Sequence, residues 1–124
     1  MKYSKQKDEI LKLMRSGALD HPRAAEVFLA MKEILPNIGI ATVYRNLNAF
    51  ADAGVLRRIS GSGDADRFDH RIDDHHHTIC NCCNKVEDFE LTPEADVSDM
   101  LQKNSGFFAQ SHYYVVRGLC RSCR

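Results

Sequence analysis

Two Cys-x-x-Cys pairs are the residues of this chain whose types and spacing point most directly to chemistry. The first pair is Cys80 and Cys83, and the second pair is Cys120 and Cys123. Each pair places two thiolates at neighbouring corners of a tetrahedron, and the two pairs together complete the coordination that structural Zn²⁺ prefers. The spacing therefore predicts a structural zinc site, with buried free thiols or a redox pair as the alternative. Cys82 is left over, and we assign it no function.

Histidines and carboxylates form a second candidate ligand set just before the first cysteine pair. Within nine residues the chain carries Asp69, Asp74, His75, His76 and His77. The alternation of side chains along a strand puts His75 and His77 on one face and His76 on the other. With Asp88 added, the set offers the nitrogen and oxygen ligands that suit iron, manganese or zinc. A solvated, charge-rich turn is the alternative interpretation.

Charge is divided unevenly along the 124 residues, although the formal net charge is zero. Residues 1–62 contain ten Lys and Arg against six Asp and Glu, whereas residues 63–124 contain seven against eleven. This asymmetry suggests a polyanion-binding front half and a cation-binding rear half.

Five cysteines, an odd number, argue against a disulfide framework. With no signal-peptide pattern and no apolar run that could span a membrane, we expect a cytoplasmic protein.

Hydrophobic periodicity predicts the elements that must position these residues. In the front half it indicates three helices within 5–17, 21–36 and 41–54, followed by a hairpin of 55–60 and 67–72 around a Gly-Ser-Gly-Asp turn. The expected core faces are Ile10, Leu11, Leu13 and Met14, then Ala25, Phe28, Met31 and Leu35, then Val43, Leu47, Phe50 and Ala51. Three helices followed by a hairpin is the order of a winged helix. Pro22 suits the first turn of the second helix.

The rear half reads as a small α/β module. Short strands are expected within 75–80, 85–91 and 112–120, with one helix within 93–104. The predicted fold class is therefore α+β, with a winged helix-turn-helix domain over 1–68, a hinge over 69–74 and a metal-binding domain over 75–124.

The polar side of the third helix is the candidate DNA-binding surface, because the second helix of a helix-turn-helix enters the major groove. The candidate contacts to bases and phosphates are Thr42, Tyr44, Arg45 and Asn48, joined by Arg57 or Arg58 from the hairpin. An amphipathic helix with a solvated polar face is the alternative.

The order of these motifs resembles the ferric uptake regulator family of metal-sensing repressors. The resemblance covers almost the whole chain and rests on the segments HPRAAEVFLAMKEILPNIGIATVYRNLNAFADAGVL, RFD, DHHHTICNCCNK and LCRSC. It implies a homodimer in which the winged helix binds double-stranded operator DNA and the C-terminal α/β domain dimerises. Asn84 departs from the family pattern, because glycine commonly follows the first cysteine pair.

Within the family, the peroxide-sensing repressors have a regulatory Fe²⁺ or Mn²⁺ site whose ligands match His21, Asp69, His75, His77 and Asp88 of this sequence. His21 taken alone, beside Pro22, indicates only a capping or surface histidine. Aspartate at position 88 favours the peroxide-sensing subtype, because iron-uptake regulators usually carry glutamate there. The resemblance implies that bound iron reacts with hydrogen peroxide, that oxygen is added to His21 or His75, and that the operator is then released. A further metal site of some relatives would use Asp74, His76, Glu94 and His112.

The sequence thus predicts a non-enzymatic repressor that senses hydrogen peroxide, with no membrane and no small organic substrate among its partners. An iron-uptake regulator that senses the iron level reversibly is the nearest alternative. A structural zinc module that mediates only protein contacts is another. A metal-dependent hydrolase is the alternative from the class of enzymes, although the sequence has no His-Glu-x-x-His helix.

Overall fold

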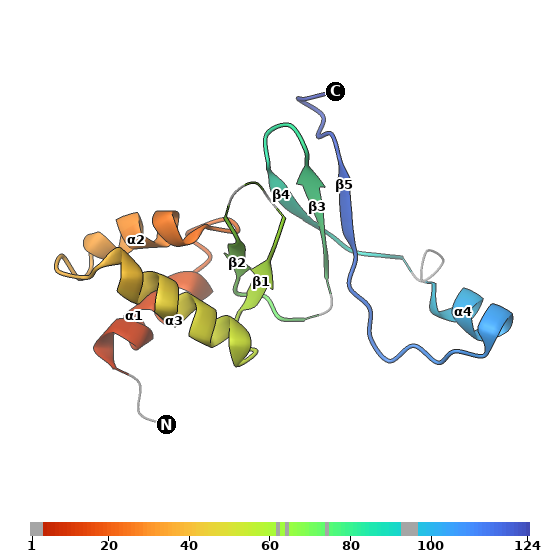
Figure 1. Cartoon of the computed structure of the whole chain (residues 1–124), viewed down its shortest axis with the longest axis horizontal. Helices are drawn as coiled ribbons and strands as arrows, with labels where there is room; N and C mark the ends of the chain where they lie inside the picture. Colours follow the sequence, from red (N-terminus) through yellow and green to blue (C-terminus); the bar gives the residue numbers. More distant parts are fainter. Residues whose placement is uncertain (1–3, 62, 64, 74, 93–96) are drawn as a thin grey trace. The chain divides into compact units, whose positions relative to one another are not determined.

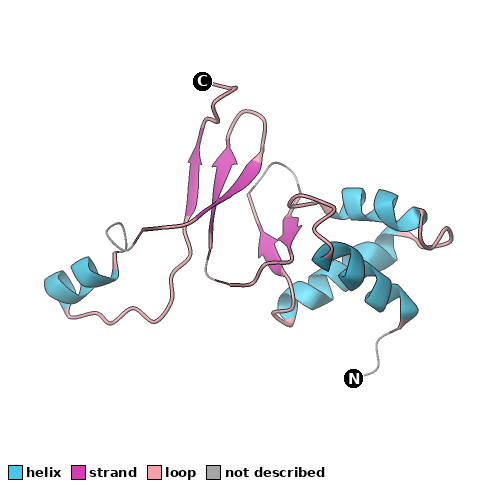
Figure 2. Cartoon of the chain, turned by 180° about the vertical axis from the view of Figure 1, so that it is seen from behind, coloured by secondary structure: helices cyan, strands magenta, loops and turns pink. Residues whose placement is uncertain are grey.

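The computed structural model describes residues 4–61, 63, 65–73, 75–92 and 97–124. The chain divides into two compact units, an N-terminal unit of Met1–Ile72 and a C-terminal unit of Asp73–Arg124 (Figure 1). Three helices and a short hairpin belong to the N-terminal unit, and a three-stranded sheet with one helix belongs to the C-terminal unit (Figure 2). Among the described residues, no helix has the length and apolar character needed to cross a membrane.

The N-terminal unit has the element order of a winged helix-turn-helix domain. Its elements are α1 (Lys5–Arg15), α2 (Ala24–Lys32), α3 (Ile40–Asp52), β1 (Arg57–Ile59) and β2 (Arg67–Asp69). The two strands pair antiparallel, with Arg58 opposite Phe68. The predicted succession of three helices and a hairpin is confirmed.

One apolar core holds this unit together, because all three helices and the hairpin bury side chains in it. Its members are Ile10, Leu11, Met14, Ala24, Val27, Met31, Ile38, Val43, Leu47, Phe50, Leu56 and Phe68. The apolar faces predicted for the first and third helices point into this core. Leu13 and Ala51 pack at its edge.

The core face of α2 differs from the prediction. Ala24, Val27 and Met31 are buried, whereas Ala25 is exposed. Positions 24, 27 and 31 share one helical stripe, and position 25 lies about 100° around the helix from position 24. Phe28 still packs against the core from the flank of that stripe.

The start of α2 also differs from the prediction, because the segment before it pairs with the hairpin. The helix begins at Ala24, not in the turn containing Pro22. The Phe68 N–H donates to the Pro22 carbonyl at 2.9 Å, and Arg23 forms an isolated antiparallel bridge with Arg67. These bonds hold residues 22 and 23 as extended chain, so the helix starts later.

The C-terminal unit contains β3 (His76–Cys80), β4 (Val86–Phe89), α4 (Ser98–Ser105) and β5 (Val115–Gly118). Its sheet has the order β4-β3-β5, in which β3 pairs antiparallel with β4 and parallel with β5. The predicted strands and helix are confirmed within the described residues. The central strand β3 is buried at every position except Thr78.

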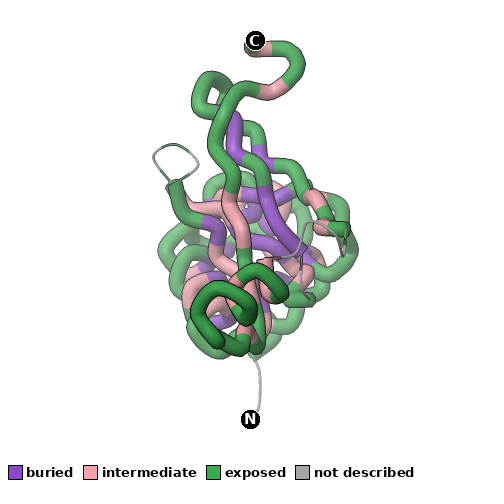
Figure 3. Tube along the Cα trace, turned by 90° about the vertical axis from the view of Figure 1, so that its right-hand side faces the viewer, coloured by how far each residue is buried: buried purple, intermediate pink, exposed green. Residues whose placement is uncertain are grey.

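The helix α4 buries none of its described residues and is largely exposed in Figure 3. Large apolar side chains on α4 and just after it are open to solvent, with Met100 53% exposed, Phe107 60% and Phe108 76%. Monomeric proteins seldom expose contiguous apolar surface of this kind, so this region is a candidate contact surface.

Candidate metal centres

The four cysteines of the two Cys-x-x-Cys pairs meet at one end of the C-terminal sheet. One pair begins at the last residue of β3 and the other follows β5, so the parallel pairing of these strands brings both pairs to the same end. Their sulfur atoms all lie within 4.8 Å of one another. Zn–S bonds of about 2.3 Å place tetrahedral sulfurs about 3.8 Å apart, and Cys83 and Cys120 are separated by 3.9 Å. The four thiols fit a tetrahedral zinc ion.

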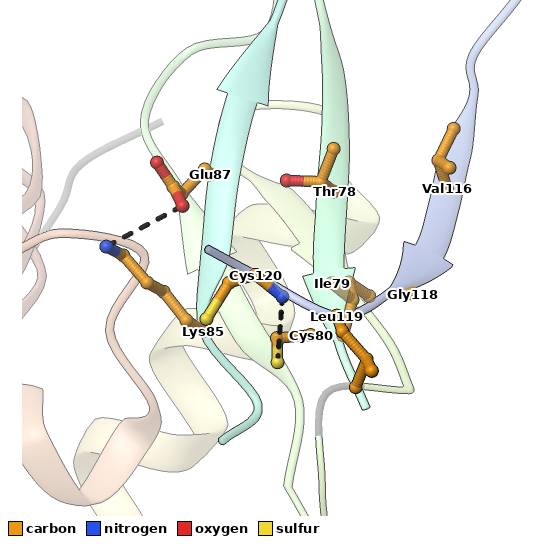
Figure 4. Close-up of a pocket in the computed structure, with 9 residues that line it drawn as sticks. All are labelled: Thr78, Ile79, Cys80, Lys85, Glu87, Val116, Gly118, Leu119 and Cys120. Atoms are coloured by element: carbon orange, nitrogen blue, oxygen red, sulfur yellow. Dashed lines mark hydrogen bonds and ion pairs between the residues drawn. The ribbon is translucent and has the colours of Figure 1, made fainter. Parts of the chain in front are cut away.

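Two backbone N–H groups stabilise the thiolate form of Cys80, which is the form that binds a cation. The N–H groups of Cys83 and Cys120 donate to it at 3.5 and 3.4 Å, and Figure 4 shows the second of these bonds. They hold the pKa of the Cys80 thiol at about 6, well below its usual value. Hydrogen bonds to sulfur stabilise the thiolate, which is the form that binds zinc.

Two of the other thiols, Cys83 and Cys123, have a raised pKa because neighbouring thiols hydrogen-bond their protonated forms. The Cys120 and Cys82 side chains raise the pKa of Cys123. For Cys83, the Lys85 N–H lowers the pKa, but the Cys80 thiol and burial outweigh it, so the pKa is raised. Thiolates this close cannot all ionise without a counter-charge, which a bound zinc ion would supply.

The turn after the first cysteine pair explains the family preference at position 84. Asn84 has φ of 64°, in the left-handed region, and its N–H donates to the Cys80 carbonyl at 2.9 Å. Glycine adopts this conformation freely, and asparagine is among the few other residues that tolerate it. The departure from the family pattern therefore preserves the turn.

A second group of candidate ligands in the C-terminal unit consists of His75, His77 and Asp88, whose side chains lie close together. Both histidines are fully buried at 0% exposure. The Nε2 atoms of His75 and His77 lie 3.5 and 3.0 Å from the same oxygen, Oδ1 of Asp88. The β3–β4 register places His77 directly opposite Asp88. This arrangement offers two imidazole nitrogens and a carboxylate, a ligand set that suits iron or manganese.

In the N-terminal unit, His21 and Asp69 form a second pair of candidate ligands. Both are buried, and His21 Nε2 lies 3.5 Å from Asp69 Oδ2. His21 has φ of 44°, which is uncommon for a residue other than glycine. Arg67 donates to the His21 carbonyl at 2.9 Å and holds this loop against β2. The sequence gives no sign of that contact, because Arg67 is 46 positions away.

The candidates for a further metal site lie partly outside the described residues. Asp74 and Glu94 belong to segments that the structure does not describe. His76 is buried on the opposite side of β3 from His77 and stacks on His112, with ring centroids 5.2 Å apart. Its Nδ1 accepts the Tyr114 N–H at 3.0 Å. The His76 imidazole is therefore packed inside the C-terminal unit, against the His112 ring and a backbone N–H.

The candidate DNA-contacting side chains differ in whether they already form hydrogen bonds within the N-terminal unit. Tyr44 and Arg45 are exposed. Asn48 is committed inside the unit, since its side-chain oxygen accepts from Arg58 at 2.9 Å and its amide donates to the Tyr44 carbonyl at 3.1 Å. Arg58 thus ties the hairpin to α3. Thr42 is half-buried near the start of the helix, and Arg57 donates to the Ile72 carbonyl at 3.5 Å.

If the exposed face of α3 is the DNA-binding surface that the sequence predicts and Arg45 reads a base there, replacing Arg45 by alanine is expected to weaken DNA binding by about 1–3 kcal/mol. Arg45 is exposed on α3, so its guanidinium can reach a guanine or a phosphate from the solvent side of the helix. Fluorescence anisotropy with labelled operator measures the effect. Zinc content and dimerisation should stay as in the unmodified protein, and unchanged affinity for DNA would remove Arg45 from the DNA-binding surface.

A winged helix joined to a module of clustered thiols, imidazoles and carboxylates defines a metal-binding transcription regulator. The family model for the ferric uptake regulator family matches residues 1–116, and the chain belongs to this family. Over 119 residues it is 33% identical to the peroxide-responsive repressor PerR of Staphylococcus saprophyticus, covering 96% of this chain and 80% of that one. Members of the family are transcription regulators, which supports the prediction that the protein is not an enzyme.

Solved structures show the same fold. The ferric uptake regulator from Francisella tularensis with iron has a TM-score of 0.82 at 30% identity, over 100% of this chain and 95% of that one. The Campylobacter jejuni peroxide stress regulator has a TM-score of 0.74 at 25% identity, over 95% and 88%. The chain is therefore similar both to an iron-uptake regulator and to peroxide regulators.

Proposed function

We propose that this protein is a homodimeric repressor that binds operator DNA with Fe²⁺ or Mn²⁺ as corepressor and releases it when hydrogen peroxide oxidises a histidine ligand. The convergence of His75 and His77 on Asp88 is the main support, because it provides a mixed nitrogen and oxygen site apart from the four cysteines. The similarity to a peroxide-responsive repressor and the aspartate at position 88 favour this subtype.

The proposed regulatory ligands are His21, Asp69, His75, His77 and Asp88. Two of them belong to the DNA-binding unit and three to the C-terminal unit. If one ion takes ligands from both, its binding favours the domain arrangement in which all ligands can reach it. Metal affinity and DNA affinity are then linked. The population of the DNA-binding arrangement increases only as far as the difference in metal affinity between the two domain arrangements allows.

The cysteine cluster has a separate, structural role in this proposal. Zn²⁺ held by Cys80, Cys83, Cys120 and Cys123 fixes the ends of β3 and β5, and β3 also presents His77. A site with four protein ligands has no open position for a substrate, which suits a structural ion.

Dimerisation is supported by exposed apolar side chains and a strand edge of the C-terminal unit. Phe107 and Phe108 are exposed, and β5 is an edge strand of its sheet within the described residues. A second copy of the chain would cover these apolar side chains and pair with the strand edge.

The peroxide mechanism is tested by mass spectrometry of the iron-loaded protein after exposure to hydrogen peroxide. One oxygen atom of the peroxide joins the imidazole ring and the other leaves as water, so peptides with His21 or His75 should gain the mass of one oxygen. The zinc-replete protein loaded with Mn²⁺ is the control, because Mn²⁺ should not support this oxidation. Absence of the mass gain in the iron form would refute histidine oxidation.

An Asp88→Glu variant separates the two subtypes in the same experiment. We expect it to keep metal-dependent DNA binding and to show little of the mass gain, because the longer carboxylate changes how the ion is held. The nearest rival, a reversible iron-level sensor, is favoured by the similarity to the Francisella tularensis regulator. If the protein is such a sensor, neither the unmodified protein nor the Asp88→Glu variant gains oxygen, and DNA binding returns when metal is restored.

A further inference from the structure

His75 and His77 are held in the same way at both ring nitrogens. In each ring Nε2 is directed at Oδ1 of Asp88, at 3.5 Å for His75 and 3.0 Å for His77. In each ring Nδ1 has an oxygen partner at hydrogen-bond distance. For His75 this is the Asp73 carbonyl at 2.9 Å, and for His77 it is the Tyr113 hydroxyl at 2.8 Å.

The partner of Nδ1 decides whether Nε2 can bind a metal. A neutral imidazole that coordinates through Nε2 keeps its proton on Nδ1, and this N–H needs an acceptor. A backbone carbonyl such as that of Asp73 can only accept, so it fixes the required tautomer of His75. The Tyr113 hydroxyl oxygen can accept the Nδ1 proton of His77 in the same manner.

We propose that Tyr113 is a positioning residue of the regulatory metal site, whose hydroxyl oxygen accepts the Nδ1 proton of His77 and thereby directs Nε2 toward the ion. This inference rests on the proposed function, because it assumes that His77 binds the regulatory metal. It adds to the site a supporting residue, beside the ligands, that the sequence patterns do not indicate.

The sheet holds Tyr113 in place for this role. The parallel pairing of β3 with β5 sets His77 beside Val115, and the His77 N–H donates to the Tyr114 carbonyl at 3.1 Å. Tyr113 immediately precedes this anchored stretch. Its ring stands edge-on to the His77 imidazole, with centroids 5.6 Å apart and an interplanar angle of 76°. The hydroxyl is therefore fixed by backbone pairing and ring packing together.

The expected effect is moderate, because Tyr113 is 41% exposed. When the hydroxyl is removed, water can reach the Nδ1 proton and replace part of the hydrogen bond. Removal of a partner of this kind typically weakens metal binding by about 10- to 100-fold, and solvent access places Tyr113→Phe near the lower limit, at about 10-fold.

The neighbouring tyrosine provides a matched control. The Tyr114 hydroxyl is buried and has no hydrogen-bond partner among the described residues. Tyr114→Phe removes the same atom from the adjacent position. We expect it to change the Mn²⁺ affinity by less than about twofold, since the Tyr114 hydroxyl makes no bond to a proposed ligand.

The test is a titration of the zinc-replete dimer with Mn²⁺, in which free Mn²⁺ is measured by electron paramagnetic resonance. Tyr113→Phe should raise the Kd about 10-fold, and saturating Mn²⁺ should restore its operator binding. An unchanged Kd in Tyr113→Phe would overturn the role of Tyr113 while leaving the proposed function intact. If the unmodified protein binds Mn²⁺ without any gain in operator affinity, the proposed function fails, but the Kd comparison still decides the role of Tyr113.

A spectroscopic measurement separates positioning from general weakening of the fold. In the Co²⁺-loaded protein, coordinated histidines give hyperfine-shifted signals from their exchangeable ring N–H protons. The His77 Nδ1 proton should exchange with water faster in Tyr113→Phe, and its signal should broaden while that of His75 stays sharp. Equal sharpness of both signals would contradict the hydrogen bond to Tyr113, and broadening of both would contradict a specific positioning role and indicate a structural effect instead.

Discussion

Replacing Cys80 by serine is expected to abolish zinc binding and to unfold the C-terminal unit. Cys80 is the most buried of the four cysteines, and its sulfur accepts the N–H groups of Cys83 and Cys120. Structural zinc contributes about 10–16 kcal/mol of apparent binding free energy in small zinc modules, comparable with or above a typical domain's stability of about 5–15 kcal/mol. This unit has a three-stranded sheet and a helix that buries no described residue, so we expect its folding to depend on the ion.

Zinc content and circular dichroism measure this outcome, and size-exclusion chromatography reports whether the dimer dissociates. Cys82→Ser is the matched control, because Cys82 is exposed and stands outside the group of four sulfurs. The control should bind zinc and dimerise as the unmodified protein does. Retention of one zinc ion per chain by Cys80→Ser would mean that the structural role of the cluster is wrong.

Replacing His77 by alanine is expected to abolish metal-dependent operator binding while zinc stays bound. His77 is fully buried, faces Asp88 at 3.0 Å and is opposite Asp88 in the β3–β4 register. Removal of a metal ligand should weaken Mn²⁺ binding by more than about 100-fold, beyond the effect of removing a residue that only supports a ligand. Under the proposed function, loss of the ion would remove the free energy of metal binding that favours the DNA-binding arrangement.

His112→Ala is the control for this prediction. His112 stacks on His76, on the other side of β3, and is not among the proposed regulatory ligands. Anisotropy with labelled operator across a Mn²⁺ titration should separate the two variants. If metal-dependent binding disappears equally in both, the regulatory site has been assigned to the wrong face of the strand. Zinc analysis of the same samples shows whether the cysteine cluster is intact.

Most predictions from local spacing agree with the structure, and the core face of α2 is one exception, because Ala24 and Val27 are buried there in place of Ala25. The Cys-x-x-Cys pairs, the helical periodicity and the strand alternation each involve residues within a few positions, whose relation is fixed by backbone geometry. For this reason the three helices, the hairpin and the opposite orientations of His76 and His77 can be predicted from the sequence. The metal-ligand types also follow from the sequence, because side-chain chemistry limits which ions can bind.

Contacts between distant positions cannot be predicted in this way. Local spacing places the start of α2 too early, because the bond from Phe68 to the Pro22 carbonyl holds that segment extended. Helical position makes Asn48 a candidate for contacting DNA, and only the fold shows that Arg58 engages its side chain. These contacts have no local pattern, since each depends on how separate elements pack.

The sequence by itself determined the class of elements and the candidate sulfur, nitrogen and oxygen ligands of this protein. Only the tertiary structure decided that β5 runs parallel to β3, which brings the second cysteine pair to the first. The same pairing sets Tyr113 beside His77, 36 positions away. Which strands pair across long loops depends on the packing of the whole unit, so the spacing of neighbouring residues cannot predict it.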